Sequence, residues 1–333
     1  MRALQLATII YALSANADEN FATKVQQRIA LAEREHLRQF NNDGSVIITC
    51  SDNSLNFYDI NTGQKKNSML LEKEHRCLSV SRDAKLLATK QVIINDPMAK
   101  YGHDTIFSFW DITGDNPKLL QKVKTKDGGT GQFSQNNKWF AIYGTDSFAL
   151  IWDVINGRLV KKIDQHQGRL TTVAFGLDDK LFASADFNTV QLWETDKWKR
   201  LRIFPDLSDI ALFSPDGKYL VSYTYINDQT VFNLWDIKKN NWYWLKPAAD
   251  FSQSHSVAFN ISSKLVAFSG KEKTYLYSVD TGKLLQEFPS TASTIAFSPD
   301  GKHLALSTYE GKSGIKRNVI YLYTSSNGTA VFE

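Results

Sequence analysis

Short runs of apolar residues, separated by polar and glycine-containing turns, follow one another along most of this chain. The segment Leu170–Trp193 contains three such runs, at Leu170–Phe175, Leu181–Ala185 and Thr189–Trp193. Each run is rich in aromatic or β-branched residues, which are typical of strands. The residues between the runs have the composition of tight turns. The pattern predicts three consecutive β-strands connected by short turns.

The same unit recurs seven times between residues 36 and 333. One ladder consists of aromatic residues that close a run, most of them before an acidic residue, at separations of 41–52 residues: Tyr58, Trp110, Trp152, Trp193, Trp235, Tyr277 and Tyr323. A second ladder marks the end of the first run in each unit: Phe40, Val80, Phe133, Phe175, Phe213, Phe259 and Phe297. The turns after Phe213 and Phe297 are near copies, Ser-Pro-Asp-Gly-Lys. Two independent patterns therefore give the same count of repeats.

A period near 42 residues with four short strands per unit is typical of a propeller blade, because one such sheet cannot bury both faces alone. In these ladders the chain resembles the WD-repeat β-propeller family over residues 36–333. We therefore expect an all-β fold, a seven-bladed β-propeller, with blades starting near residues 36, 75, 128, 165, 205, 250 and 290. Since the final run Thr329–Glu333 fits the start of an outer strand, each blade is expected to consist of contiguous chain.

The resemblance also implies a hydrogen-bond tetrad of His, Asp, Ser or Thr, and Trp inside a blade. His166 stands nine residues before Phe175, and Asp52 and Asp146 stand six residues before their ladder aromatics, as the family pattern requires. No repeat combines both residues, because the fourth places Phe187 at the Asp position. The tetrads are therefore expected to be degenerate, with stability coming mainly from packed aromatic residues.

Residues 1–35 do not fit the repeat. Two sets of apolar residues at helical spacing predict a short helical hairpin there: Leu4, Ala7, Ile10 and Tyr11, then Phe21, Val25, Ile29 and Ala32. The hairpin and its loop, Ser14–Asn20, resemble the helical linker that precedes the propeller in STAND-type signalling NTPases. This resemblance implies a sensor within a larger multidomain signalling assembly, although the P-loop motif of such an NTPase does not occur in this sequence.

A competing interpretation makes residues 1–17 a signal peptide. Arg2 precedes an apolar run, Ala3–Leu13, and Ala15-Asn16-Ala17 has the form of a cleavage site. The helical hairpin goes with a cytoplasmic protein, whereas a signal peptide goes with a periplasmic or secreted one.

Composition and motifs narrow the range of possible functions further. The net charge is +4, from 39 Lys and Arg against 35 Asp and Glu, and it is too mild and well mixed to indicate a nucleic-acid partner. Cys50 and Cys77 lack metal-ligand spacing; adjacent repeats could bring them together, but buried reduced thiols are expected. The six histidines form no metal-binding pair, and the glycine-rich segment 127–131 lacks the lysine of a phosphate loop. No cofactor, metal, catalytic residue or membrane association is therefore expected.

Three repeats have longer connections between their second and third strands than a turn needs: Gln91–Asp104, Tyr223–Gln229 and Tyr309–Asn318. In the WD-repeat family, connections of this type share one face of the ring. Long connections on a rigid scaffold are commonly functional. The candidate binding residues on them are aromatic and basic: Lys100, Tyr101, His103, Tyr223, Tyr225, Lys312, Lys316 and Arg317.

Aromatic and arginine side chains supply most interface anchors, and basic groups suit an acidic or extended peptide. We therefore expect a non-catalytic protein-interaction scaffold or sensor module that binds a protein or peptide partner through one propeller face. The alternatives are a periplasmic or secreted ligand-binding propeller and a propeller enzyme. An enzyme needs convergent catalytic groups in the axial funnel, and none can be placed from the sequence.

Overall fold

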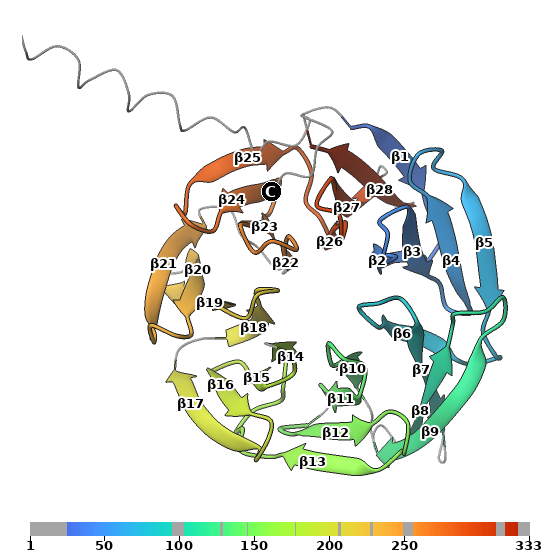
Figure 1. Cartoon of the computed structure of the whole chain (residues 1–333), viewed down its shortest axis with the longest axis horizontal. Coiled ribbons are helices and arrows are strands. Elements are labelled where there is room, and N and C mark those ends of the chain that lie inside the picture. The colour runs from blue at the N-terminus through green and yellow to red at the C-terminus, as the bar shows by residue number, and fades with distance from the viewer. Residues whose placement is uncertain are drawn as a thin grey trace, which may run out of the picture.

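The seven predicted repeats form a ring of seven sheets (Figure 1). The computed structural model describes residues 25–94, 103–126, 129–144, 146–176, 178–205, 208–226, 229–248, 256–310 and 317–325. Within these residues every sheet has four antiparallel strands. The prediction of an all-β, seven-bladed propeller is confirmed.

In each blade the first strand lies nearest the axis and the fourth on the circumference (Figure 1). Blade one contains β2 (His36–Phe40), β3 (Val46–Cys50), β4 (Ser54–Asp59) and β5 (Lys65–Leu70). Blade two contains β6 (Arg76–Val80), β7 (Leu86–Ile93), β8 (Asp104–Asp111) and β9 (Lys118–Lys126). Blade three contains β10 (Thr130–Phe133), β11 (Trp139–Tyr143), β12 (Ala149–Asp153) and β13 (Leu159–Ile163). Blade four contains β14 (Thr172–Gly176), β15 (Leu181–Ala185), β16 (Thr189–Glu194) and β17 (Lys199–Pro205).

The remaining three blades continue the same order around the ring. Blade five contains β18 (Ser208–Phe213), β19 (Tyr219–Ile226), β20 (Gln229–Asp236) and β21 (Asn241–Ala248). Blade six contains β22 (Val257–Phe259), β23 (Leu265–Ser269), β24 (Thr274–Ser278) and β25 (Leu284–Phe288). Blade seven contains β26 (Thr294–Phe297), β27 (His303–Glu310), β28 (Arg317–Thr324) and, from the other end of the sequence, β1 (Gln27–Ala30).

A recurrent β-bulge accounts for the aromatic ladder. In six blades the register between the third and fourth strands shifts at the ladder residue, for example between Leu192 and Trp193 in blade four. A bulge bends a strand and re-aims its side chains. The ladder aromatic is buried in most blades, with Trp193 only 1% exposed. In these six blades the ladder therefore marks the bulge between the third and fourth strands.

The core of the ring lies between neighbouring blades. One buried cluster joins Val190 of blade four to Phe213 and Trp235 of blade five. Between blades two and three, the rings of Phe109 and Phe140 meet edge to face with centroids 5.1 Å apart, a favourable aromatic geometry. Each sheet is thus buried on both faces by its two neighbours, which a single blade could not achieve.

The ring closes through β1, and this corrects two predictions. Ile29 of β1 pairs with Ile320 of β28, so blade seven combines distant parts of the chain instead of contiguous residues. Ile29 is also 2% exposed in the core, within an extended strand, so the second predicted helix is wrong at residues 27–30. The first predicted helix, the possible signal peptide and the final run Thr329–Glu333 lie outside the described residues.

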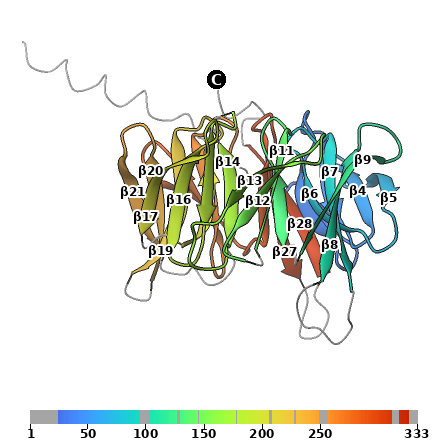
Figure 2. The same cartoon turned by 90° about the horizontal axis from the view of Figure 1, so that it is seen from below.

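Alternating strand directions give the disc two distinct faces (Figure 2). We call the face that carries the connections from first to second strands, such as Asn41–Ser45, the turn face. The opposite face carries the connections from second to third strands and those between blades, and we call it the loop face. By this topology the three lengthened connections all open on the loop face.

At their bases those connections begin as strands that extend the hairpins. In blade two Ile93 pairs with Asp104, and in blade seven Glu310 pairs with Arg317. In blade five the ladder of pairs continues to the last residue of β19, which leaves two residues before β20. The predicted loop at Tyr223–Gln229 is therefore mostly strand.

Candidate functional site

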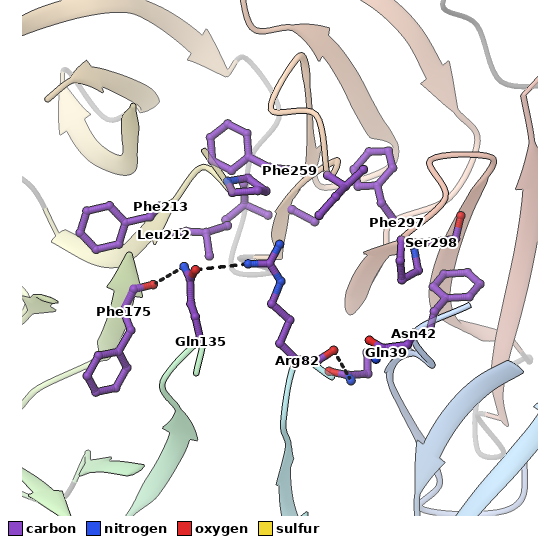
Figure 3. Close-up of a pocket in the computed structure, with 16 residues that line it drawn as sticks. Gln39, Asn42, Arg82, Gln135, Phe175, Leu212, Phe213, Phe259, Phe297 and Ser298 are labelled. Atoms are coloured by element: carbon purple, nitrogen blue, oxygen red, sulfur yellow. Dashed lines mark hydrogen bonds between the residues drawn. The ribbon is translucent and has the colours of Figure 1, made fainter. Parts of the chain in front are cut away.

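An axial cavity opens at the turn face and is lined by residues from all seven blades (Figure 3). Its volume is about 520 Å³, within the range of small-molecule sites. Six lining residues each stand two positions after the ladder residue that ends a first strand: Asn42, Arg82, Gln135, Pro215, Ile261 and Pro299. In six of the seven blades the repeat therefore places one side chain at the equivalent position around the axis.

The turns that hold these residues are fixed by their own side chains. In blade seven the Ser298 hydroxyl donates to Asp300 at 2.5 Å and accepts the backbone N–H of His303 at 2.9 Å. Gly301 takes a φ of +71°, which only glycine adopts without strain. These bonds satisfy the turn internally and give the cavity a rigid rim.

The polar side of the cavity is an inter-blade relay. The Arg82 guanidinium donates to Gln135 Oε1 at 3.3 Å, and Gln135 Nε2 donates to the Phe175 carbonyl at 3.1 Å. On the other side Gln39 Nε2 donates to the Ser81 carbonyl at 2.7 Å. Figure 3 shows the Arg82 side chain reaching into the cavity between these two amides. The relay links blades one to four and holds Arg82 in place.

A second cavity, the rim cleft, lies on the loop face between blades one and two. Its volume is about 550 Å³, and its charged or titratable lining residues are Glu33, Asp52, Glu74, His75 and Arg76. All except His75 are exposed. Burial lowers the pKa of His75, although Glu72 opposes the shift, so His75 is favoured in its neutral form.

The predicted binding residues that the structure describes do not line the axial cavity. Lys100, Tyr101, Lys312 and Lys316 lie outside the described residues. His103 immediately precedes β8 and is half-buried, Tyr225 lies in β19, and Arg317 begins β28. Tyr223 is 0% exposed and packs against the Phe232 ring with centroids 6.2 Å apart, so its side chain belongs to the core and cannot contact a partner while β19 is folded.

Blade four contains a complete tetrad, contrary to the prediction. His166 Nδ1 lies 2.9 Å from Asp186 Oδ2, and its Nε2 lies 2.7 Å from Ser184 Oγ, which accepts the indole N–H of Trp193 at 3.0 Å. The acidic residue is Asp186, one position before Phe187, and the Phe187 side chain is 60% exposed. The spacing argument failed because the turn before β16 is one residue out of step with the family pattern.

The electrostatics of the tetrad favour a neutral imidazole. Burial lowers the pKa of His166, although Asp186 opposes the shift. Burial alone would raise the pKa of Asp186, but hydrogen bonds from the Asn188 amide, His166 and the Thr189 amide outweigh it, and the pKa is lowered. A neutral histidine can donate a hydrogen bond to Asp186 and accept one from Ser184. Each of the four tetrad side chains then has a hydrogen-bond partner.

Blade one replaces the histidine of this arrangement with a buried carboxylate. Glu35, 0% exposed, accepts hydrogen bonds from Thr49, from Asn56 Nδ2 at 2.8 Å and from the Tyr58 hydroxyl at 3.1 Å. Burial, and then the charge of Glu35, raise the pKa of Tyr58. Sequence reasoning missed Glu35, because it stands five residues before Phe40 whereas His166 stands nine residues before Phe175.

Cys50 and Cys77 form a disulfide between blades one and two, with Cα atoms 6.0 Å apart. The prediction of reduced thiols is wrong in this structure, because adjacent blades bring the two residues together. Among the described residues no group of three or more His, Cys, Asp or Glu side chains could hold a metal ion. The same part of the chain contains no helix long and apolar enough to span a membrane.

Comparison with known proteins agrees with this geometry. The family model described as WD domain, G-beta repeat (WD40) matches residues 34–59, which include the first three strands of blade one. Blade one of this seven-bladed β-propeller thus matches a WD40 repeat. The propeller is 24% identical over 200 residues to Autophagy-related protein 16 of Arabidopsis thaliana, an alignment covering 56% of this chain and 38% of that protein.

Two further relatives carry names from pre-mRNA processing. Pre-mRNA-processing factor 19 homolog 2 of Arabidopsis thaliana is 27% identical over 177 residues, which cover 51% of this chain and 33% of that protein. Pre-mRNA-processing factor 19 of Oryza sativa subsp. japonica is 25% identical over 180 residues, which cover 51% of this chain and 34% of that protein. The propeller thus aligns with little more than a third of each relative's length.

Proposed function

We propose that this propeller is a non-catalytic scaffold that binds a protein or peptide partner on its loop face. The observation that carries the proposal is the rim cleft, whose exposed charged residues lie between blades one and two. Two extended hairpins, β7–β8 of blade two and β27–β28 of blade seven, border blade one on either side (Figure 1). The predicted basic and aromatic residues Lys100, Tyr101, Lys312 and Lys316 belong to the connections of these hairpins.

The names of the relatives support a binding function for this fold more than one particular catalytic reaction. These names refer to autophagy and to pre-mRNA processing, two different cellular processes. A fold that serves unrelated processes carries its function in the surfaces grafted onto it. The cleft combines cationic Arg76 with anionic Glu33, Asp52 and Glu74, so a partner with both charges, in an extended segment, fits it.

Hairpin shortening tests the proposal. Ile93 and Asp104 are paired, and so are Glu310 and Arg317, so a two-residue Asn-Gly turn can replace the chain between each pair. Tagged wild type and the double-shortened variant are compared by capture from native lysate and mass spectrometry. The variant should lose the partners that wild type enriches, and Arg76→Glu in the cleft should weaken the same set.

The matched control is Arg158→Glu, an exposed arginine in a turn of blade three, away from the loop face. It should leave capture unchanged. If the shortened protein retains a wild-type circular dichroism spectrum and captures the same partners, binding does not use the loop face.

The disulfide favours a second candidate, a periplasmic or secreted ligand-binding propeller. Disulfides persist in oxidising compartments and are rare in the cytosol. Rapid alkylation of native cells before lysis, followed by mass spectrometry of Cys50 and Cys77, decides between the two. Fully alkylated cysteines would support a cytoplasmic scaffold. An intact disulfide, together with an N-terminus after Ala17, would support export.

A further inference from the structure

The axial cavity on the turn face has two chemically different halves. Blades one to three contribute polar groups, chiefly Gln39, Arg82 and Gln135. Blades five to seven contribute apolar groups, among them Leu212, Ile261 and Pro299. Figure 3 shows Gln39 and Gln135 in the lower half of the view and Leu212 and Phe259 in the upper half, with Arg82 extending between them. A ligand spanning the cavity therefore meets a polar wall at one end and an apolar wall at the other.

Arg82 is the cation that this cavity presents. Within the described residues its guanidinium bonds to the neutral amide of Gln135, and no carboxylate forms an ion pair with it. The nearest acidic residue in sequence, Asp83, instead accepts the Ser81 hydroxyl at 2.7 Å and the Lys85 amide at 3.2 Å. A guanidinium has five donors, so Arg82 retains capacity for an anion.

Acidic residues near the turn face are engaged by neighbouring groups. Asp216 pairs with Lys218 at 3.0 Å and Asp300 with Lys302 at 3.7 Å. The Asp179 carboxylate has no ion pair among the described residues and accepts the backbone N–H groups of Gln135 at 2.6 Å and Asn136 at 2.8 Å. None of these acids lines the cavity, and among its described lining residues Arg82 is charged and none is acidic.

We propose that the axial cavity is a binding site for a small amphipathic carboxylate, whose carboxylate group pairs with Arg82 and whose apolar chain lies against Leu212, Ile261 and Pro299. Charge complementarity selects the head group, because a guanidinium binds a carboxylate through paired, charge-assisted hydrogen bonds. The relay through Gln39 and Gln135 positions Arg82 before the ligand arrives, which limits the entropy lost on binding. A cavity of about 520 Å³ holds a molecule of this size, whereas a protein partner needs a far larger surface.

This site is distinct from the proposed protein-binding face. It lies on the turn face, and the rim cleft and extended hairpins lie on the opposite, loop face. Loss of one function therefore leaves the other measurable, and the two proposals fail separately.

Calorimetric titration of the whole chain at pH 7.5 provides the test, with octanoate as the probe. Octylamine and octanol serve as matched ligands of the same chain length, and acetate lacks the apolar chain. Octanoate should bind, while octylamine should not, and octanol and acetate should each bind at least about tenfold more weakly. Equal binding of octanoate and octylamine, or no binding of octanoate at millimolar concentration, overturns the proposal on wild-type protein alone.

Two variants locate the site. Arg82→Met keeps an unbranched apolar stem and removes the charge, so octanoate should bind about 10- to 100-fold more weakly. Ile261→Asp places a carboxylate on the exposed apolar wall, where Ile261 is 43% exposed, and should also weaken octanoate. Arg169→Met, at an exposed arginine before β14, is the matched control and should bind as wild type. Unchanged affinity in either Arg82→Met or Ile261→Asp, with wild-type circular dichroism, overturns the assignment.

Discussion

The buried tetrad of blade four should stabilise the ring by several kcal/mol, and His166→Ala measures it. Removing the imidazole deletes the hydrogen bonds to Asp186 and Ser184. The Asp186 residue is 2% exposed and keeps the Thr189 hydroxyl as a side-chain donor. A hydrogen bond to a charged group contributes about 1.5–3 kcal/mol and the neutral bond to Ser184 about 1 kcal/mol, and the lost imidazole leaves a cavity. We therefore expect His166→Ala to lower the free energy of unfolding by about 3–5 kcal/mol.

Blade two supplies the matched comparison. His75 occupies the corresponding place and is also buried, with Nδ1 2.8 Å from the Thr89 hydroxyl, which accepts the indole N–H of Trp110. It has no buried aspartate partner among the described residues. His75→Ala creates a similar cavity but breaks only one neutral bond inside the blade, worth about 1 kcal/mol. The difference between the two variants, about 2 kcal/mol, isolates the contribution of Asp186.

Urea unfolding followed by tryptophan fluorescence and by circular dichroism gives both values, provided that the two transitions coincide. The double variant His166→Ala/Asp186→Ala should be more stable than the sum of the single changes predicts, by at least about 1.5 kcal/mol. Equal losses for His166→Ala and His75→Ala, or additive single changes, would refute the argument that the buried pair carries the stability.

The remaining predictions use the same unfolding assay. Because burial lowers the pKa of His166 below its ordinary 6.5, the unfolded chain takes up a proton that the folded chain resists. Stability should therefore fall as the pH drops below 6.5, and identical pH slopes for wild type and His166→Ala would contradict this. Ile29→Ala should cost about 2–4 kcal/mol, since Ile29 is buried in the closing strand, and a change below about 1 kcal/mol would place β1 outside the ring. Trp198, which precedes β17, contacts the Trp139 and Phe182 rings, so Trp198→Ala should lower the free energy of unfolding by about 1–3 kcal/mol. An unchanged free energy of unfolding would show that these ring contacts do not hold blades three and four together. Reduction of the Cys50–Cys77 disulfide, which spans 27 residues, should cost about 3–4 kcal/mol by loop entropy, and a reduced chain of equal stability would contradict it.

The fold was predictable because its repeats leave a strong sequence signal. In six blades the ladder aromatic stands at a bulge, and each ladder phenylalanine or valine lies at or next to the end of a first strand, so both patterns recur with the blade. The closing strand left no such signal. Of its four residues only Ile29 is buried, and one apolar residue cannot distinguish a strand from a helix. The spacing of Val25, Ile29 and Ala32 then favoured the helix.

The candidate binding surfaces were only partly predictable. Connection lengths identified the hairpins of the loop face, but they could not show that Tyr223 extends a buried strand. The axial cavity left a signal in the sequence. In six blades the cavity is lined by the residue two positions after the ladder residue of the first strand. Their convergence depends on ring closure at a fixed register, which no single repeat encodes. The relay from Arg82 to Gln135 is likewise a contact between repeats.

The closing strand also has a consequence for how this ring forms. Ile29 must find Ile320, nearly three hundred residues away in sequence, whereas the other strands pair with near neighbours. Closing a loop of that length costs roughly 5 kcal/mol of chain entropy, against about 1 kcal/mol for a hairpin turn. Six blades can therefore assemble in sequence as the chain is made. Residues 27–30 are made first and stay unpaired until β28 is made, and until the two strands pair the edge of β28 is open to strands of other molecules. Ring closure sets both the slow step of folding and the stage at which misassembly between copies is most dangerous.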